Sequence, residues 1–433
     1  LFAASSDTWL LVFDNAASAK EVQPWRPLVG HVDIVATSTN AVAWSGWRAH
    51  GVPHLARTDS IALLEMRMGV SAPSADWRRK ASQLSADLDD WPLTLDLACA
   101  YLSASGRGIE FAPQYVSLLM SKIIDEEVLM PEGYKTHSTL LRAVVVALEG
   151  LESRAKSSPG PGSRRHGVAS ATMETMAYLP GRSAHANLAV TAAVDLLDEE
   201  LQDDPDAVVD AVAFALAEFS LASRRMDAQS RSLQSTFRVN EVVLHVVRAR
   251  HSVRRRAEVL RSVIESAYGH VTRAIDERAR ADAELVAPSA TSALRWLLES
   301  GYASMYGTLL AGNLAVLWSA LNQPEISLEY FELELHVLNT LGQHAPVLRA
   351  KIHAAIASNL ATLERPTPEI LDAVSKCVLM LDQWPVDDAE SDRTAVLYQL
   401  ETVLNLLRRN PREDPSHRTL IDVAYSALAS IHR

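Results

Sequence analysis

The stretch WLLVFDNAASA, Trp9–Ala19, joins a run of apolar residues directly to Asp14. An uninterrupted apolar run of this length, rich in residues that suit a pleated surface, predicts a strand buried on both faces, as in a parallel sheet covered by helices. Asp14 then lies at the carboxyl end of the strand, the edge where ligands bind in open α/β sheets. A carboxylate there can hold the water shell of a metal ion against a bound phosphate. The structural alternative is that Asp14 caps a helix beginning near Ser18.

A second strand is predicted at VDIVATSTN, Val32–Asn40, after a connection that Pro24 and Pro27 interrupt. A strand, a short crossover and another strand form the parallel unit, so both strands end at the same edge of the sheet. The second strand ends in three small hydroxyl residues, Thr37, Ser38 and Thr39. We therefore expect these side chains to lie beside Asp14.

Composition excludes several classes of protein. The chain has 433 residues, 48% of them hydrophobic, which is ample for about two to four domains with real cores and excludes a disordered protein. A net charge of -12 argues against a chain-wide binder of nucleic acid or anionic membranes, although it allows a local basic patch. Cys99 and Cys377 lie far apart in helical patterns, which predicts inert core thiols and a reducing compartment. No apolar run approaches the roughly 18 residues of a membrane span, so we expect a cytoplasmic protein without a membrane partner.

Helical patterns follow the second strand. DSIALLEMRMG, residues 59–69, places Ile61, Leu64 and Met68 on one helical face. In DDWPLTLDLACAYLSASG, residues 89–106, Asp89 or Asp90 is predicted to cap a helix. Pro92 lies in the first turn of that predicted helix and Gly106 ends it.

Three segments, in this order, resemble the NB-ARC class of signalling ATPases, the STAND family of nucleotide switches. LLVFDNA (10–16) is similar to the Walker B strand, VDIVATSTNAVAW (32–44) to the sensor strand and WPLTLDLACAYL (91–102) to the GLPL segment, whose Pro lies against the adenine. The resemblance implies a bacterial-type P-loop ATPase that binds ATP or ADP with Mg²⁺. It makes Asp14 the catalytic acid that holds Mg²⁺ through water. The nucleotide-binding residues that it implies are Asn15, Thr37, Ser38, Thr39, Pro92, Leu93 and Asn240.

Departures from the family limit the chemistry. Asn15 stands where the family often has an acid that polarises water, and an amide cannot take a proton. The sensor strand ends in Thr39 instead of Arg, so a cation for the terminal phosphate is missing. The sequence contains no G-x-x-x-x-G-K-[ST], and no Gly is followed by Lys. Family order places that loop before Leu1, so we expect the chain to be a truncated piece of a longer protein and, as written, not to hydrolyse ATP.

A winged helix is the next predicted element. VASATMETMAYLP (168–180) and DAVVDAVAFALAEF (206–219) predict helices, and SLASRRMDAQSRSLQSTFRV (220–239) predicts a hairpin. In the resembling bacterial proteins such a domain follows the nucleotide domain, and Asn240 then stands where the family usually has a phosphate-sensing His. The basic run RARHSVRRRAEVLR, residues 248–261, adds DNA binding as an alternative.

Internal similarity organises the last third of the chain. NLAVLWSALNQPE (313–325) and NLATLERPTPE (359–369) each lead through a Pro-bearing turn into a second helical pattern. Helix pairs at this interval predict a stacked solenoid, with an irregular helical bundle as the alternative. NTLGQHAP (339–346) resembles the end of tetratricopeptide repeats of the kinesin light chain type, which implies a protein or peptide partner. The aromatic residues could line a peptide groove, but helical spacing favours core positions for Trp296, Tyr302, Trp318, Tyr330 and Phe331.

The predicted fold is therefore multidomain and mostly α, with a partial parallel α/β domain at the start. We expect the end of a nucleotide-binding domain at 1–80, a helical subdomain at 81–135, a winged-helix-like domain at 136–255 and tetratricopeptide-like repeats at 256–433. The predicted function is a nucleotide-dependent signalling switch that senses a partner through its repeats and shifts toward a homo-oligomer. The alternatives are an interaction scaffold with a decayed nucleotide site and a winged-helix transcriptional regulator.

Overall fold

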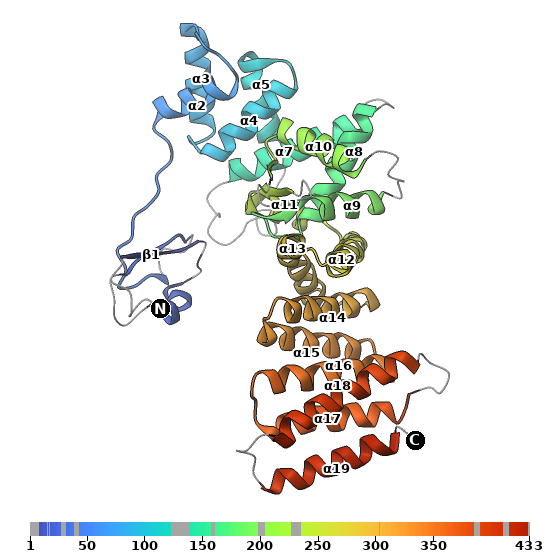
Figure 1. Cartoon of the computed structure of the whole chain (residues 1–433). Helices are drawn as coiled ribbons and strands as arrows, with labels where there is room; N and C mark the ends of the chain where they lie inside the picture. The colour runs from blue at the N-terminus through green and yellow to red at the C-terminus, as the bar shows by residue number, and fades with distance from the viewer. Residues whose placement is uncertain are drawn as a thin grey trace. The chain divides into compact units, whose positions relative to one another are not determined.

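A computed structural model of the chain describes residues 8–14, 16, 18–26, 32–38, 43–122, 138–156, 161–197, 204–226, 235–302, 304–384, 390–409 and 415–431. They form two compact units, coloured along the chain in Figure 1. The first unit comprises Leu1–Ser157, Leu216–Leu221 and Glu241–Arg250, and the second comprises Ser158–Ala215, Ala222–Asn240 and His251–Arg433. Both units consist mainly of helices, in agreement with the predicted multidomain, mostly α protein.

The first unit begins with the predicted parallel strand pair. Strand β1 (Trp9–Phe13) leads through helix α1 (Ala19–Val22) and the 3-10 turn η2 (Gln23–Trp25) toward β2 (Val32–Ala36). The register pairs Trp9 with Val32 and Phe13 with Ala36, so both strands end at the same edge. The parallel pairing expected from the two apolar runs is therefore confirmed.

Burial of this sheet differs from the prediction. Along both strands, half-buried residues alternate with exposed ones. Leu10 and Val12 are 61% and 62% exposed and Val35 is 49% exposed. The prediction of a strand buried on both faces is thus wrong for the described part of the chain, because those residues leave one face of the sheet uncovered. The apolar run therefore predicted the strand correctly, but it did not predict which faces of the sheet other elements cover.

A group of helices makes up the rest of the first unit. Its members are α2 (Arg57–Arg67), α3 (Ala75–Asp87), α4 (Pro92–Ala104), the 3-10 turn η4 (Gly108–Phe111), α5 (Ala112–Ser121), α7 (Ser138–Lys156) and α11 (Glu241–Arg250). Helix α4 packs against α2 and α7, and α7 also contacts α5 and α11. Leu64, Leu95 and Tyr115 are fully buried in this group. The amphipathic pattern of residues 59–69 therefore predicted α2 correctly, since Leu64 lies on its buried face.

The start of α4 corrects one expectation. Neither Asp89 nor Asp90 caps the helix, because its N-cap residue is Trp91 and no side chain caps it. Asp89 and Asp90 instead have positive φ angles, 57° and 52°. The Asp90 carboxylate accepts hydrogen bonds from Nε and Nη2 of Arg57, at 2.8 and 2.6 Å. This ion pair joins α2 to the turn before α4, and the Arg57 bond lowers the pKa of Asp90.

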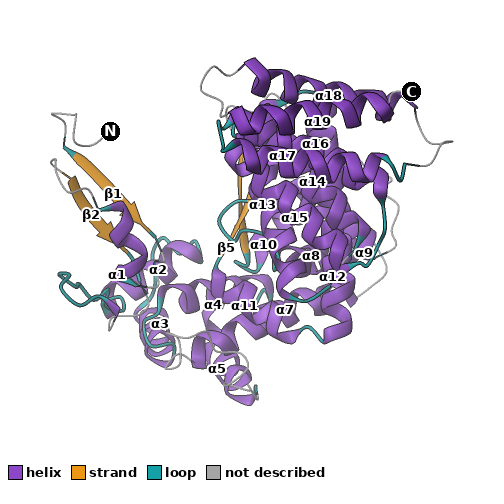
Figure 2. Cartoon of the chain, turned by 90° about the horizontal axis from the view of Figure 1, so that it is seen from below, coloured by secondary structure: helices purple, strands orange, loops and turns teal. Residues whose placement is uncertain are grey.

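The second unit opens with helices and a small antiparallel sheet. The order is α8 (Pro161–Met176), β3 (Ala184–His185), α9 (Ala186–Leu196), α10 (Pro205–Glu218), β4 (Ala222–Met226) and β5 (Ser235–Val239). In this sheet β5 lies between β3 and β4 and is antiparallel to both. Figure 2 shows the strands in orange among purple helices. The helix, helix and hairpin predicted from residues 168–239 are all present, and the short strand β3 was not predicted.

Long helices complete the second unit. They are α12 (Val253–Asp276), α13 (Arg280–Glu299), α14 (Met305–Ala320), α15 (Pro324–Thr340), α16 (Pro346–Thr362), α17 (Thr367–Leu381), α18 (Glu390–Arg409) and α19 (Pro415–Ile431). Helices α14 and α15 pack as one pair and α16 and α17 as another, and α15 contacts α16 (Figure 1). The two NLA segments lie in α14 and α16, each followed by a short turn into its partner helix, as their sequences predicted.

One buried cluster runs through these pairs, from Ala315 in α14 to Leu428 in α19. Phe331 belongs to this core and is 6% exposed, so the preference for a core position is confirmed for that residue. Of the predicted domain boundaries, 80/81 falls inside α3 and 255/256 inside α12. The four-part division remains a prediction. None of the described helices is both long and apolar enough to cross a membrane.

Candidate functional site

Asp14 and Thr37 meet at the carboxyl edge of the parallel sheet. The register places Phe13 opposite Ala36, so each residue is the first beyond its strand. Thr37 Oγ1 donates a hydrogen bond to Asp14 Oδ1 at 2.5 Å. The backbone continues the pairing, since the Thr37 amide donates to the Phe13 carbonyl at 2.8 Å and the Ala16 amide donates to the Thr37 carbonyl at 2.9 Å. The two predicted site residues are therefore brought together by the strand ends.

The alternative role for Asp14, a helix cap, does not match this geometry. Helix α1 begins at Ala19, its N-cap residue is Ser18, and no side chain makes a capping hydrogen bond. Asp14 lies outside the first turn and its carboxylate is used across the sheet edge. Both Asp14 and Thr37 are exposed, so solvent reaches the pair. An exposed carboxylate fixed by a hydroxyl can accept hydrogen bonds from the waters of a hard cation.

The other predicted residues are distributed over the chain. Ser38 follows Thr37 and is exposed, whereas Asn15 and Thr39 lie outside the described residues. Pro92 is the first residue of α4 and is exposed, and Leu93 is half-buried. Asn240 is exposed between β5 and α11, at the end of a segment of the second unit. The structure therefore joins Asp14 with Thr37, and the nucleotide roles of all the predicted residues stay predictions.

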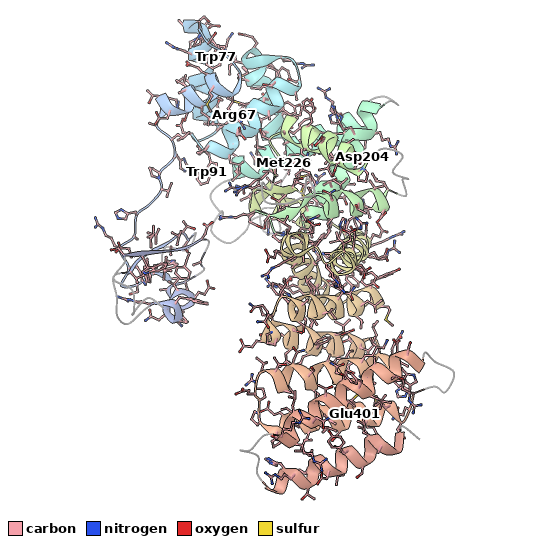
Figure 3. All side chains as sticks on the ribbon, in the orientation of Figure 1. Arg67, Trp77, Trp91, Asp204, Met226 and Glu401 are labelled. Carbon is pink, nitrogen blue, oxygen red and sulfur yellow. The ribbon has the colours of Figure 1, made fainter. Side chains whose placement is uncertain are left out.

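A set of contacts that sequence patterns did not predict holds the start of α4. The Leu55 amide donates to the Asp90 carbonyl at 3.1 Å, and His54 Nδ1 lies 2.5 Å from the Asp89 carbonyl oxygen. The His54 ring also meets the edge of Trp91, with centroids 4.8 Å apart. Trp91 is labelled at the start of α4 in Figure 3. The segment before α2 thus holds the turn that precedes Pro92. These contacts could not be predicted, because the sequence of that segment has no helical or strand periodicity.

The described residues fit Mg²⁺ only in part. A single carboxylate held by a hydroxyl suits a cation that keeps most of its waters. Within the described segments, no group of three or more His, Cys, Asp and Glu could hold a metal ion directly. The thiols do not change this, because burial raises the pKa of both Cys99 and Cys377 to about 12. The pair at the sheet edge can therefore contribute to the water shell of Mg²⁺, while the phosphates would need other groups.

The basic run after β5 proves to be a series of ion pairs. In the first unit, Arg250 pairs with Glu152 at 3.0 Å and Arg248 with Glu241 at 3.7 Å. In the second unit, Arg254 pairs with Glu258 at 2.9 Å. Arg255, also in the second unit, donates to both oxygens of Glu174, at 2.6 and 3.1 Å. Carboxylates therefore neutralise much of the basic patch that the sequence suggested.

Comparison with solved structures shows a weak likeness. No protein-family model matches the chain, and no curated protein matches it. A solved structure, that of a signal transduction ATPase with numerous domains (STAND) and a tetratricopeptide repeat sensor from Pyrococcus horikoshii, is similar at a TM-score of 0.32 and 10% sequence identity. The alignment covers 98% of this chain and 65% of that protein. At this TM-score the likeness does not assign a fold or a function.

Proposed function

We propose that this chain contributes to a nucleotide-dependent signalling switch, in which Asp14 helps to hold Mg²⁺ through water and the helices of the second unit bind a protein partner. The observation that carries the proposal is the Thr37–Asp14 hydrogen bond at the carboxyl edge of a parallel strand pair. Ligands of open α/β sheets bind at this edge. A carboxylate oriented there by a hydroxyl has the chemistry and the place for the acidic side of a Mg²⁺–nucleotide site.

Mg²⁺, when bound, would supply positive charge that neutralises the phosphates, and Asp14 would hold its water shell. The role of this chain is to orient a water-binding carboxylate. The hydrogen bond from Thr37 to Oδ1 of Asp14 restricts rotation of the Asp14 side chain. Pro92 and Leu93, at the start of α4, are proposed to face the adenine, and Ser38 to donate a hydrogen bond to a phosphate. Asn15 and Thr39 complete the proposed set.

The first prediction follows from the missing phosphate loop. The sequence has no G-x-x-x-x-G-K-[ST], whose backbone amides and Lys would hold the phosphates. Calorimetric titration of the 433-residue chain with ADP or ATP, with Mg²⁺ present, is expected to show affinity weaker than about 1 mM. A longer version of the protein that includes a phosphate-binding loop should bind ADP. Low-micromolar ADP affinity in the 433-residue chain would refute this, and no binding in the longer version would favour the scaffold alternative.

The partner-binding part of the proposal rests on the shared core of the helix pairs. One buried cluster extends from α14 to α19, so these helices share a continuous hydrophobic core. Their outer faces therefore form one continuous surface. We propose that they are tetratricopeptide-like repeats. A stack of this kind binds an extended protein or peptide by surface complementarity and performs no chemistry of its own.

The second prediction tests this region by itself. Ser304 caps α14 by accepting a hydrogen bond from the Gly307 amide at 3.0 Å, so a fragment from 304 to 433 begins at a natural helix start. We expect the fragment to unfold cooperatively, measured by circular dichroism, and to retain the affinity of the full chain for its protein partner within about threefold. A folded fragment that loses the partner would contradict a repeat-borne site. A fragment from Ser289 is less suitable because Ser289 lies inside α13.

DNA binding has less support than partner binding. The region from α8 to β5 has the element order of a winged helix, and we propose that fold for it. In such a domain α10 would be the helix offered to DNA, yet its sequence, PDAVVDAVAFALAE, contains no Lys or Arg. Asp206 and Asp210 lie on it, and the Asp210 carboxylate is paired with Arg224. An acidic helix beside neutralised arginines would repel the phosphates of DNA.

A further inference from the structure

A cavity of about 230 Å³ lies between α13 and α15 in the second unit. Its lining comes from residues 291–298 of α13 and residues 329–333 of α15, in the middle of both helices. The volume is below the roughly 300–1,000 Å³ of drug-sized ligand pockets, so the cavity suits a smaller molecule. None of its lining residues belongs to the candidate site at the parallel sheet.

Three leucines make the apolar part of the cavity. Leu294 is 1% exposed, and Leu298 and Leu333 are half-buried. Leu294 and Leu298 lie one turn apart on the same face of α13, and Leu333 lines the cavity from α15. Half-buried leucines leave apolar surface in contact with water, which an aliphatic group of a ligand would remove. This part of the cavity therefore favours an aliphatic group.

A pair of hydroxyls crosses from one helix to the other. Tyr330 Oη of α15 and Thr291 Oγ1 of α13 share a hydrogen bond at 2.7 Å. Both side chains are half-buried and line the cavity. Each hydroxyl carries one hydrogen and only one hydrogen makes the shared bond, so the other can donate to a ligand. The cavity thus combines an apolar surface with a polar group.

Two opposite charges lie on the two helices, Arg295 on α13 and Glu329 on α15. Both are exposed, and neither forms a hydrogen bond or an ion pair within the described part of the chain. Burial raises the pKa of Tyr330, the bond with Thr291 and the charge of Arg295 lower it, and the charge of Glu329 raises it. Both charged groups therefore lie near the same hydroxyl. A guanidinium and a carboxylate on separate walls are complementary to a ligand that carries both a carboxylate and an ammonium group.

We propose that this cavity binds a free amino acid with an aliphatic side chain of about the size of leucine. The α-carboxylate of the ligand would pair with Arg295, and its ammonium group would pair with Glu329. Its side chain would cover the three leucines, and the hydroxyl pair would donate to the carboxylate. Since the lining comes from two helices, the bound amino acid would join α13 to α15 and stabilise the second unit.

The test uses the full chain with L-leucine as the probe. Calorimetric titration should show a Kd below about 1 mM. N-acetyl-leucine lacks the ammonium group and leucinamide lacks the carboxylate, so each should bind at least about tenfold more weakly than leucine. L-aspartate, which would bring a charged side chain to the apolar surface, should also bind at least about tenfold more weakly.

Two variants of the chain separate the two charges. Glu329→Gln should weaken leucine binding at least about tenfold and should abolish the preference for leucine over N-acetyl-leucine. Arg295→Gln should weaken leucine binding similarly and should abolish the preference for leucine over leucinamide. Glu332→Gln, an exposed change on α15 outside the lining, is the matched control and should leave leucine binding unchanged.

Three results would overturn the proposal. They are absence of leucine binding, equal affinity for leucine and either of its two blocked derivatives, and unchanged leucine affinity in either variant. The first two results are obtained with the parent chain, so they remain decisive even if circular dichroism shows that a variant does not fold. The nucleotide proposal is independent of every one of these outcomes.

Discussion

Replacing Glu334 with Met is expected to stabilise the protein, and to do so more at pH 8 than at pH 4.5. Glu334 lies on α15 and is 3% exposed. Its carboxyl packs directly on Gly312 of α14, where an added Cβ would lie 2.5 Å from Oε1. No hydrogen bond or ion pair links this carboxyl to the described residues, so burial alone raises its pKa, to about 8. Met has a similar length, is unbranched and brings no polar group into the core.

The direction of the pH effect follows from the pKa. The carboxyl has an ordinary pKa of 4.5 in the unfolded chain and about 8 in the folded protein. Below pH 4.5 it is protonated in both states, and its unfavourable effect on folding is smallest. Between pH 4.5 and 8 the Glu334 carboxyl ionises in the unfolded chain but stays protonated in the folded protein. The free energy of unfolding therefore falls as the pH rises. The loss reaches about 4 kcal/mol, as an upper bound, near pH 8.

Urea unfolding at pH 4.5, 6 and 8, followed by circular dichroism, measures this effect. The gain in unfolding free energy of Glu334→Met over the parent should grow by about 4 kcal/mol across that interval. Glu332→Met, an exposed change on the same helix, is the control and should show no such growth. Equal gains for Glu334→Met at all three pH values would show that the carboxyl is ionised in the folded protein, against this account.

Patterns of apolar residues predicted those helices and strands whose formation depends on residues close together in the sequence. Continuous apolar runs identified β1 and β2, and the polar residues after them placed Asp14 and Thr37 at one edge. Period-3.6 patterns with Pro in the turn identified the pair α14 and α15. These signals work because strand and helix each impose a fixed side-chain repeat.

Features that depend on distant residues had no such signal. Asp89 or Asp90 was expected to cap α4, but Arg57, 33 positions before Asp90, offers the Asp90 carboxylate a stronger charge-assisted bond. The strand β3 has two residues and shows no alternation. Contacts between residues so far apart in the sequence depend on the tertiary fold, so local patterns in a single sequence do not predict them.

Asp14 is proposed to hold Mg²⁺ through water and not to stabilise the fold. The substitution Asp14→Asn keeps the shape of the side chain and can still accept the Thr37 bond, but it removes the negative charge. Loss of an outer-shell carboxylate typically weakens a metal site about 10- to 100-fold. An Asn side chain keeps this hydrogen bond across the sheet edge, so a purely structural Asp14 would tolerate the change. The two roles therefore predict different responses to Mg²⁺.

The decisive measurement is the ATP affinity of a longer version of the protein that includes a phosphate-binding loop, with and without Mg²⁺, for the parent and for Asp14→Asn. Mg²⁺ should strengthen ATP binding in the parent, and in the variant this gain in affinity should be at least about tenfold smaller. Thr37→Ser, which preserves the hydroxyl, serves as the control and should keep most of the gain. Melting temperatures of the three proteins should agree within a few degrees. An unchanged Mg²⁺ effect in Asp14→Asn would show that Asp14 is a structural residue and does not hold Mg²⁺.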